Sequence, residues 1–354
     1  MTTLLFASTE DSTGKTAVAL ALGQLARERD VSVGYMKPKG TRLQSNVGKT
    51  LDADPMLARD ILDLDAEMHE MEPIVYSPTF VDGAIRGQEN ATELRDRVTE
   101  AFEDLADGTD LMLVEGAGQY ITGNVIDLAE DDVADLVDAD VILLERIRTT
   151  GDLDRILGAV DRLEERCDGI VFNAVSDSMY DTVESDIVPF LEGKGVPVFG
   201  VIPHSRELAG VTLTDLTDEL GGEVLTGSEE DVFIERVLVG AMSGESALSH
   251  FRRTKDAAVV TGGDRSDIQR AALEAPGVKA LILTGGFDPP GAVLGTAAGR
   301  NKPVLKVRSD TLATVERAEE LIRGGRVRDA RTIELMRSLL HDHVDVDTIL
   351  ELDE

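Results

Sequence analysis

The stretch that most constrains this chain is Ser8-Thr9-Glu10-Asp11-Ser12-Thr13-Gly14-Lys15-Thr16. An apolar run over residues 4–7 precedes it and predicts a buried strand, and the Leu and Ala spacing over residues 17–28 predicts a helix. A strand, a loop of small residues, Gly-Lys-Thr and a helix form the context of a phosphate-binding loop, where backbone N–H groups and the helix dipole attract an anion. We expect Lys15 to reach the β- and γ-phosphates of a nucleotide and Thr16 to contact Mg²⁺. The alternative is an ordinary strand-to-helix turn with an exposed lysine.

The residues that follow predict alternating strands and helices. Such alternation indicates a parallel sheet covered on both faces, with ligands bound beyond the carboxyl ends of the strands. Helices are expected over residues 50–64 and 91–105, and a long irregular segment over residues 72–88, which contain two prolines and two glycines. Strands are expected over residues 31–36, 111–114, 141–144, 169–172 and 196–202.

Three charged residues stand where such a sheet binds ligands. Glu115 ends a short apolar strand, where a nucleotide fold places an acid near its magnesium; the alternative is a solvated loop carboxylate. Asp54 begins a predicted helix and is either a metal ligand or an N-cap. Lys37 follows the second strand and either meets a carboxylate or phosphate or is a solvated loop lysine.

These pieces together give a specific resemblance. Residues 1 to about 208 resemble the dethiobiotin synthetase family and the amino-terminal domain of long phosphate acetyltransferases. The matching pieces are residues 9–16, Gly34-Tyr35-Met36-Lys37-Pro38, Asp54, Val114-Glu115-Gly116-Ala117-Gly118, Asn173 and Gly200-Val201-Ile202-Pro203.

The resemblance implies an ATP and Mg²⁺ site and a homodimer. Lys15 and Lys37 would be the catalytic residues, with Lys37 facing the substrate or the transferred group. Asn173 and the backbone near Pro203 would recognise the base. The metal would be held by Thr16, Asp54 and Glu115, and the nucleotide by Glu10, Asp11, Ser12, Thr13, Gly14, Lys15, Thr16, Asn173 and Pro203.

The chain departs from the resembling family around the loop. The full phosphate-loop consensus has glycine where Thr9 stands, and the family usually has glycine at Ser12 and Asp-Thr at Glu10-Asp11. The extra acid would repel a triphosphate unless Mg²⁺ or a substrate cation offsets its charge. Lys39, Thr41 and Arg42 follow Lys37-Pro38 where small polar residues are usual, which favours an anionic ligand.

The second half predicts a smaller α/β unit that resembles the DRTGG domain of long phosphate acetyltransferases. It follows a polar stretch over residues 221–231, and two of its predicted strands run into Thr-Gly-Gly. The expected domains are a P-loop domain over residues 1–210, a DRTGG domain over 211–325, and a C-terminal helix with an acidic tail over 326–354. Either the glycines only make tight turns, or the following residues lie at a small-molecule effector pocket or a dimer interface: Asp264, Arg265, Thr284, Gly285 and Asp310.

The charge composition limits the partners. The chain has 68 acidic and 35 basic residues among 354, a formal net charge of -33, which disfavours nucleic acid and anionic membranes. An acidic, lysine-poor surface spread along the whole chain indicates a protein from a high-salt cytoplasm. The single cysteine, Cys167, excludes an intrachain disulfide, and we expect a cytoplasmic protein without a signal peptide or membrane span.

Two functions fit these observations. The first is an ATP-binding regulatory or sensing protein of acetyl-CoA or acetate metabolism, acting on an acyl-CoA or acetate enzyme and without acetyltransferase activity, since no residues remain for that domain. The second is an ATP-dependent ligase of the dethiobiotin synthetase type that acts on an anionic small molecule. Neither the substrate nor the effector follows from the sequence.

The net charge gives a first prediction. Lowering the salt concentration should loosen the fold, because carboxylates then repel one another over longer distances. The Debye length, beyond which charges are largely screened, grows from about 3 Å at 1 M salt to about 30 Å at 0.01 M. Circular dichroism in dilute buffer and in multi-molar KCl measures the effect. Identical spectra would refute the high-salt interpretation.

Overall fold

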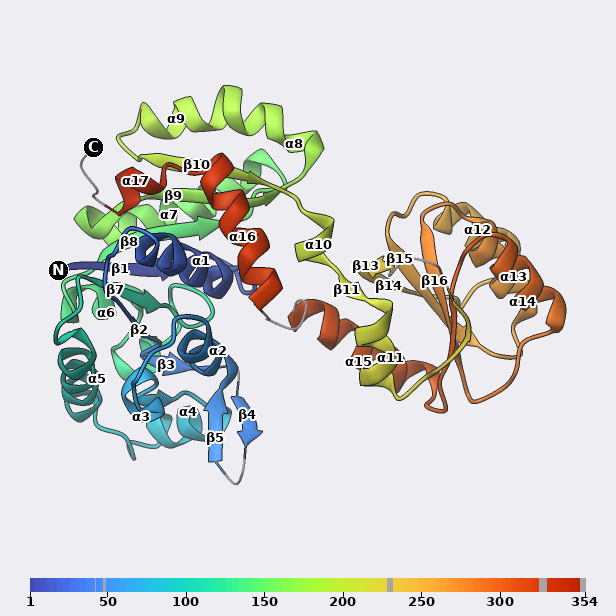
Figure 1. Ribbon diagram of the computed structural model, residues 1–354, viewed down its shortest axis with the longest axis horizontal. Coiled ribbons are helices and arrows are strands. Elements are labelled where there is room, and N and C mark those ends of the chain that lie inside the picture. Colours follow the sequence, from blue (N-terminus) through green and yellow to red (C-terminus); the bar gives the residue numbers. More distant parts are fainter. Residues whose placement is uncertain (42, 47–48, 228–231, 325–329, 351–354) are drawn as a thin grey trace. The chain divides into compact units, whose positions relative to one another are not determined.

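The structure is a computed structural model that describes residues 1–41, 43–46, 49–227, 232–324 and 330–350 (Figure 1). The chain divides into two compact units. The first unit comprises Met1–His204 and Arg328–Glu354, and the second comprises Ser205–Val327. The C-terminal segment from Arg328 therefore packs with the first unit.

The first unit is built on a six-stranded sheet in which all neighbours pair in parallel. The predicted parallel α/β fold is thereby confirmed. Its strands read as continuous apolar runs because both faces of the sheet are covered. In spatial order they are β10 (Val198–Pro203), β9 (Cys167–Val175), β8 (Asp140–Glu145), β1 (Thr2–Ala7), β7 (Leu111–Glu115) and β2 (Val33–Met36).

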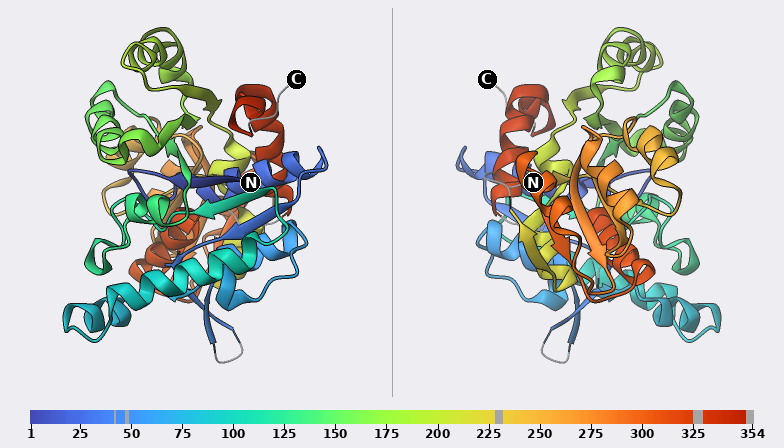
Figure 2. Two further views of the ribbon diagram at one scale, coloured as in Figure 1. Left: turned by 90° about the vertical axis from the view of Figure 1, so that its left-hand side faces the viewer. Right: turned by 90° about the vertical axis from the view of Figure 1, so that its right-hand side faces the viewer.

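Helices surround this sheet. Helix α16 (Ala330–His343), drawn in red, packs against α1 (Lys15–Arg27), drawn in blue, although the two are separated by most of the sequence (Figures 1 and 2). A short bridge between Gly200 and Val344 joins the end of this helix to β10. The other helices of the unit are α5 (Ala91–Ala106), α6 (Glu130–Leu136), α7 (Leu153–Leu163), α8 (Asp177–Thr182), α9 (Val188–Glu192) and α17 (Val346–Ile349), with shorter turns at Asn124–Ile126, Thr150–Asp152, Glu164–Arg166 and Val183–Ile187.

The segment between β2 and α5 differs from the prediction. The helix expected from residue 50 starts at α2 (Ala53–Ile61), because β5 (Lys49–Asp52) first pairs with β4 (Leu43–Asn46) in a hairpin. The segment expected to be irregular contains a helix, α4 (Pro78–Ile85): Pro78 occupies its first turn, where a missing N–H costs nothing, and Ser77 caps it. The remaining elements are β3 (Lys39–Gly40), which pairs with β6 (Ile74–Val75), and α3 (Met68–Met71).

The second unit is built on a five-stranded sheet. Its order is β12 (Glu223–Thr226), β17 (Val304–Lys306), β16 (Val278–Thr284), β15 (Ala257–Gly262) and β14 (Arg236–Val239), parallel except for β12. Part of the polar stretch over residues 221–231 is thus an edge strand, whereas residues 228–231 lie outside the described residues. The helices are α10 (Arg206–Ala209), α11 (Leu213–Leu220), α12 (Gly244–Phe251), α13 (Ser266–Glu274), α14 (Gly291–Gly299) and α15 (Thr311–Gly324), and β11 (Val211–Thr212) pairs with β13 (Phe233–Ile234).

Two hydrophobic clusters cover the two faces of this second sheet. Val259 and Leu281 belong to one cluster, and their neighbours Val260 and Ile282 belong to the other. Successive side chains of a strand point to opposite faces, so the sheet has a core on each side. The strands of this unit are apolar for the same reason as those of the first.

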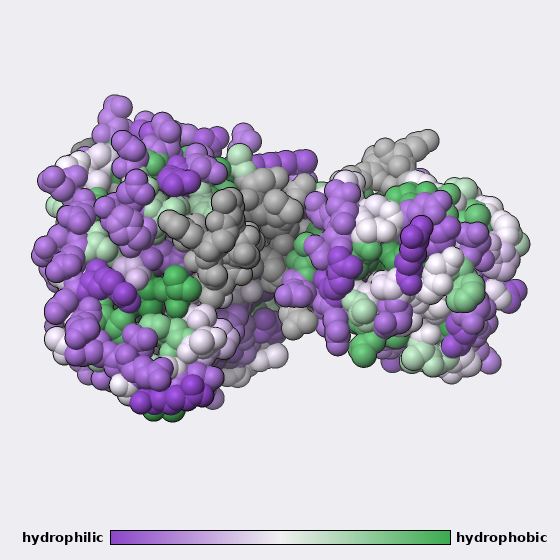
Figure 3. All heavy atoms as spheres, turned by 90° about the horizontal axis from the view of Figure 1, so that it is seen from below, coloured by the Kyte–Doolittle hydropathy of each residue, from purple (hydrophilic) through white to green (hydrophobic). Residues whose placement is uncertain are grey.

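The surface is polar, as the composition requires. On the face shown in Figure 3, hydrophilic residues predominate over the first unit, and hydrophobic residues form small patches. None of the helices in the described part of the chain is both long enough and apolar enough to span a bilayer.

The return of α16 to the first unit can be tested at Leu340, which is 1% exposed. Leu340→Ala should lower the free energy of unfolding by about 2–5 kcal/mol, because it leaves a cavity among packed side chains. Denaturant unfolding measures this loss. Ser338→Ala, at an exposed position of the same helix, is the control, and equal stability of the two variants would contradict the packing.

Candidate functional site

The loop between β1 and α1 borders a cavity of about 360 Å³ in the first unit. The cavity lies beyond the carboxyl ends of β1, β2 and β7, where parallel sheets bind ligands. Its lining includes residues from the loop, from the end of each strand and from α2: Asp11, Ser12, Thr13, Gly14, Lys15, Thr16, Lys37, Thr41, Asp54, Tyr76, Glu115, Gly116, Gly118 and Thr122.

Gly14 shapes the end of the loop. Its φ of 101° lies in the left-handed region, and a Cβ there would stand 2.6 Å from the Asn173 side-chain nitrogen. That nitrogen donates a hydrogen bond to the Thr13 carbonyl at 2.8 Å. Ser12 also has a positive φ, 56°, at the position where the resembling family carries glycine. The Thr13 hydroxyl is buried and has no hydrogen-bond partner among the residues that the structure describes.

Lys15 is buried at the start of α1 and points back over the loop. Its Nζ donates to the Ser8 hydroxyl at 2.7 Å and to the Gly118 carbonyl at 2.6 Å. Burial lowers the pKa of Lys15, and the Glu115 and Glu130 carboxylates act in the opposite direction. The Ser8 hydroxyl and the Gly118 carbonyl are neutral acceptors. An anion in the cavity would form stronger, charge-assisted hydrogen bonds with this ammonium.

Glu115 joins the loop to the neighbouring strand. One carboxylate oxygen accepts a hydrogen bond from the Thr16 hydroxyl, and the other accepts one from the Tyr35 hydroxyl, each at 2.7 Å. The carboxylate is buried at the end of β7, directly beside the end of β1 in the sheet. The sequence therefore placed Glu115 correctly beside Thr16, and the solvated alternative is wrong.

Lys37 lies among three buried carboxylates. Its Nζ is 2.9 Å from Asp52 Oδ2 and 3.8 Å from Glu115 Oε1, and it donates a hydrogen bond to Asp54. Lys37 is 2% exposed, so the alternative of a solvated loop lysine is wrong. Asp52, not Asp54, caps α2 by accepting a hydrogen bond from the Asp54 backbone N–H.

A second buried pair supports the loop after β7. Lys39 lies 3.3 Å from Glu130 Oε1, and the same oxygen accepts a hydrogen bond from the Ala117 N–H at 2.8 Å. Burial raises the pKa of Glu130. Burial likewise raises the pKa of Glu72, which accepts a hydrogen bond from the Asp52 backbone, to about 7. Lys39 is therefore a buried structural residue beneath the site and does not line the cavity.

Two arginines compensate the acid that departs from the family pattern. Arg148 binds Glu10 through two hydrogen bonds of 2.9 and 3.0 Å, and Arg155 binds it at 2.5 Å. Burial alone would raise the pKa of Glu10, but the two arginines outweigh it and lower the pKa. The protein's own arginines thus offset the charge of this acid, a role that the sequence alone assigned to Mg²⁺ or a substrate cation.

Thr9 occupies the consensus glycine position and is hydrogen-bonded to Glu145, which ends the neighbouring strand β8. Its backbone N–H donates to Glu145 Oε1 at 2.7 Å, its hydroxyl bonds to the same carboxylate, and Arg155 donates to that hydroxyl at 2.8 Å. Burial raises the pKa of Glu145 to about 7. Sequence reasoning missed Glu145, although it ends an apolar strand just as Glu115 does.

The remaining predicted positions are dispersed. Pro203 ends β10 and pairs in register with Val175, and it is not among the residues that line the cavity. Arg42 lies outside the described residues. In the second unit, Arg265 bonds to Asp267 and to the Met242 carbonyl, and Asp310 caps α15 by accepting from Ala313 N–H. Thr284 and Gly285 follow β16 at the same edge of the sheet.

The oxygen ligands of the first unit suit a hard cation. Thr16, Glu115 and Asp54 supply a hydroxyl and two carboxylates, the ligand type that Mg²⁺ prefers. Within the described part of the chain, no three His, Cys, Asp or Glu side chains are grouped as a metal site. Mg²⁺ usually takes one or two carboxylates and completes its shell with water and phosphate oxygens, so these residues fit a metal that arrives with a nucleotide.

A parallel sheet with this loop, a buried Gly-Lys-Thr and a strand-end glutamate defines the P-loop NTPase class of protein. The chain belongs to the family described as AAA domain, whose model matches residues 2–212. A second family, the DRTGG domain, matches residues 215–321. Both parts of the arrangement expected from the sequence are thereby confirmed.

Curated relatives match this chain to different extents. A phosphate acetyltransferase of Pseudomonas putida is 24% identical over 98% of this chain and 51% of its own length. A probable cobyric acid synthase of Methanothermobacter thermautotrophicus is 29% identical over 58% of this chain and 45% of its own length. The chain thus spans about half the length of these curated relatives. Among solved structures, the CBS and DRTGG domains of the regulatory region of a Clostridium perfringens pyrophosphatase, complexed with the activator diadenosine tetraphosphate, match with 21% identity and a TM-score of 0.28 over 37% of this chain and 66% of that one.

The buried cluster around Lys37 gives a stability prediction. Lys37→Met should lower the free energy of unfolding by about 3–5 kcal/mol, because it leaves buried carboxylates without their cation. Denaturant unfolding measures the change. Lys194→Met, at an exposed position of the same unit, is the matched control and should change stability by less than about 0.5 kcal/mol. Equal effects of the two substitutions would contradict the role of Lys37.

Proposed function

We propose that the first unit binds ATP with Mg²⁺ and that the protein is a nucleotide-dependent regulator or sensor in acetyl-CoA or acetate metabolism. The observation that carries the nucleotide part is the convergence of Lys15, Thr16 and Glu115 on one cavity beside the loop. The buried Thr13 hydroxyl, unsatisfied among the described residues, supports a ligand there.

Each residue has a role in this proposal. Lys15 exchanges the Ser8 and Gly118 acceptors for phosphate oxygens, and residues Glu10 to Gly14 wrap the phosphates with their backbone. Thr16, Asp54 and Glu115 hold the metal, which when bound neutralises charge on the phosphates. Asn173 orders the loop through the Thr13 carbonyl. In this proposal it also recognises the base, together with the backbone at Pro203.

The regulatory part rests on the pair of domains and on the relatives. Phosphate acetyltransferases align with nearly the whole of this chain, which makes an acyl-CoA or acetate enzyme the partner of choice. In this proposal a small-molecule effector binds the DRTGG unit and the protein works as a homodimer in the cytoplasm. We assign no acetyl-transfer step to either unit.

One observation favours a second function, an ATP-dependent ligase of the dethiobiotin synthetase type. Lys37 lines the same cavity as Lys15, so an anionic substrate beside the γ-phosphate would meet its ammonium. In that case Lys37 positions the nucleophilic oxygen and Lys15 stabilises the developing charge. The ion pairs of Lys37 with Asp52 and Asp54 would then compete with the substrate.

The phosphate-loop proposal predicts that Lys15→Ala abolishes ATP binding and leaves the fold intact. Calorimetric titration of ATP in high KCl with Mg²⁺ measures binding, and circular dichroism checks the fold. Glu115→Gln should weaken the dependence of binding on Mg²⁺. Wild-type affinity in Lys15→Ala, or an unchanged Mg²⁺ titration in Glu115→Gln, would refute the corresponding role.

ATP turnover separates the two functions. Hydrolysis that depends on one added carboxylate, amine or CoA ester would identify a ligase and name its substrate class. Tight binding with negligible or indifferent turnover supports the regulator. Lys15→Ala is the control for contaminating ATPase activity in both assays.

A further inference from the structure

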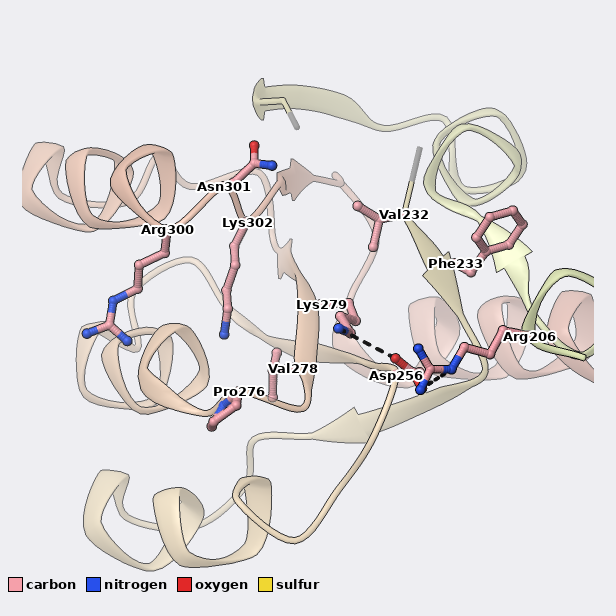
Figure 4. A pocket seen from close by; sticks show the side chains of 10 residues that line it. All are labelled: Arg206, Val232, Phe233, Asp256, Pro276, Val278, Lys279, Arg300, Asn301 and Lys302. Atoms are coloured by element: carbon pink, nitrogen blue, oxygen red, sulfur yellow. Dashed lines mark ion pairs between the residues drawn. The ribbon is translucent and has the colours of Figure 1, made fainter. Parts of the chain in front are cut away.

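The second unit contains a cavity of about 490 Å³ (Figure 4). Its lining residues stand where the parallel strands begin: Asp256 directly precedes β15, Val278 starts β16 and Lys302 lies shortly before β17. The cavity therefore lies at the amino ends of the parallel strands, whereas Asp264 and Arg265 follow the carboxyl end of β15. No position singled out in the sequence belongs to it.

The cavity is lined mainly by cationic side chains, although the chain as a whole is acidic. Four cationic side chains line it, and Asp256 is the one acid in the lining. The chain as a whole has about two acidic residues for each basic one, 68 against 35. A net positive cavity on so acidic a protein concentrates anions. The four cations are Arg206, Lys279, Arg300 and Lys302.

One carboxylate is shared by two of these cations. Asp256 Oδ1 lies 3.6 Å from Lys279 Nζ, and its Oδ2 lies 3.6 Å from Arg206 Nε. Figure 4 shows both cations directed toward Asp256 from different elements. Both distances exceed those of ordinary hydrogen bonds, so the ammonium and the guanidinium keep donors for a ligand.

The other two cations are held by neutral groups. Lys302 Nζ donates to the Ala275 carbonyl at 2.6 Å, and Arg300 donates to the Leu273 carbonyl at 3.0 Å, both at the C-terminal end of α13. These carbonyls orient the side chains without neutralising them. Burial, together with the charges of Arg300 and Lys279, lowers the pKa of Lys302 to about 8. Lys302 thus experiences uncompensated positive charge.

Apart from Asn301, the rest of the lining is apolar, and it includes an aromatic ring. Phe233 is half-buried, and Val232, Pro276 and Val278 complete this wall. The volume lies within the range of small-molecule pockets, about 300–1,000 Å³. A cavity lined by four cations and an aromatic ring suits a ligand with phosphates and a planar base.

We propose that this cavity binds the nucleoside diphosphate part of a metabolite, with the phosphates at Lys279, Arg206 and Lys302 and the base toward Phe233. ADP and coenzyme A both contain this part, and either would bind through the same contacts. The site is independent of the phosphate loop of the first unit, and it gives the DRTGG unit a ligand class of its own.

The test uses the full-length chain carrying Lys15→Ala, so that the phosphate loop is silent. ADP, coenzyme A and inorganic pyrophosphate are titrated separately by calorimetry without Mg²⁺. We expect ADP or coenzyme A to bind with one site per chain and more tightly than pyrophosphate, and the tighter of the two names the source of the nucleoside. Absence of binding by all three would overturn the proposal, and pyrophosphate binding as tightly as both would overturn its nucleoside part.

Paired charge variants make the test specific. Lys279→Gln should weaken binding about tenfold, the value of one charge-assisted hydrogen bond, and Asp256→Asn should strengthen it because the competing carboxylate is lost. Asn tolerates the positive φ of 47° at this position. Arg270→Gln, an exposed charge of α13 outside the lining, should leave binding unchanged. Weaker binding in both cavity variants, or no change in either, would contradict the site.

Proton uptake provides a readout that separates this site from the first unit. A bound anion should raise the pKa of Lys302, so binding near pH 8 should take up protons, which is measured as a dependence of the binding heat on the buffer. ATP binding at the phosphate loop of an otherwise wild-type Lys279→Gln chain should be unchanged. Loss of ATP binding in the Lys279→Gln chain would show one coupled site instead of two and would overturn the proposal. Loss of ATP binding in the Lys15→Ala chain alone concerns only the phosphate loop of the first unit.

Discussion

The site of the first unit depends on the carboxylate of Glu115. It ends a buried strand and contacts Thr16 of the loop helix and Tyr35 of the neighbouring strand, and it lies close to Lys37. Buried charges cost several kcal/mol each unless they are paired, and here Lys37 is shared among three carboxylates. The ends of three strands and the start of α2 are therefore held in one arrangement by electrostatics around a polar cavity. A nucleotide with Mg²⁺ would add charges of both signs to this site, where Lys37 faces three carboxylates.

The loop between β1 and α1 also contacts β8 and the residues that follow β8. Thr9 and Glu10 differ from the usual residues, and each has a partner from β8 or the residues after it: Glu145 for Thr9, Arg148 and Arg155 for Glu10. The substitution of glycine by Thr9 is accommodated because its hydroxyl and N–H are both bonded. These contacts offset the charge of the additional acid within the protein itself.

Much of this could be predicted from the sequence, because the strand–loop–helix pattern and the apolar strands depend on local residues. Lys15, Thr16 and Glu115 were placed together because each follows or precedes a recognisable strand. The partners of Lys37 could not be found in the same way. Asp52 belongs to a hairpin that the sequence did not predict, and it caps α2, which was one of the two roles considered for Asp54. Arg148 and Arg155 have no motif, and the cavity in the second unit gathers cations from several separate segments.

The most direct test is an experimental structure of the protein with Mg²⁺ and a non-hydrolysable ATP analogue. The account predicts that Lys15 leaves the Ser8 hydroxyl and the Gly118 carbonyl for the β- and γ-phosphates, with the metal beside Thr16 and Glu115. Glu10 should remain bound to Arg148 and Arg155. A loop without nucleotide at saturating analogue, or a nucleotide bound while Lys15 keeps its present contacts, would contradict the account.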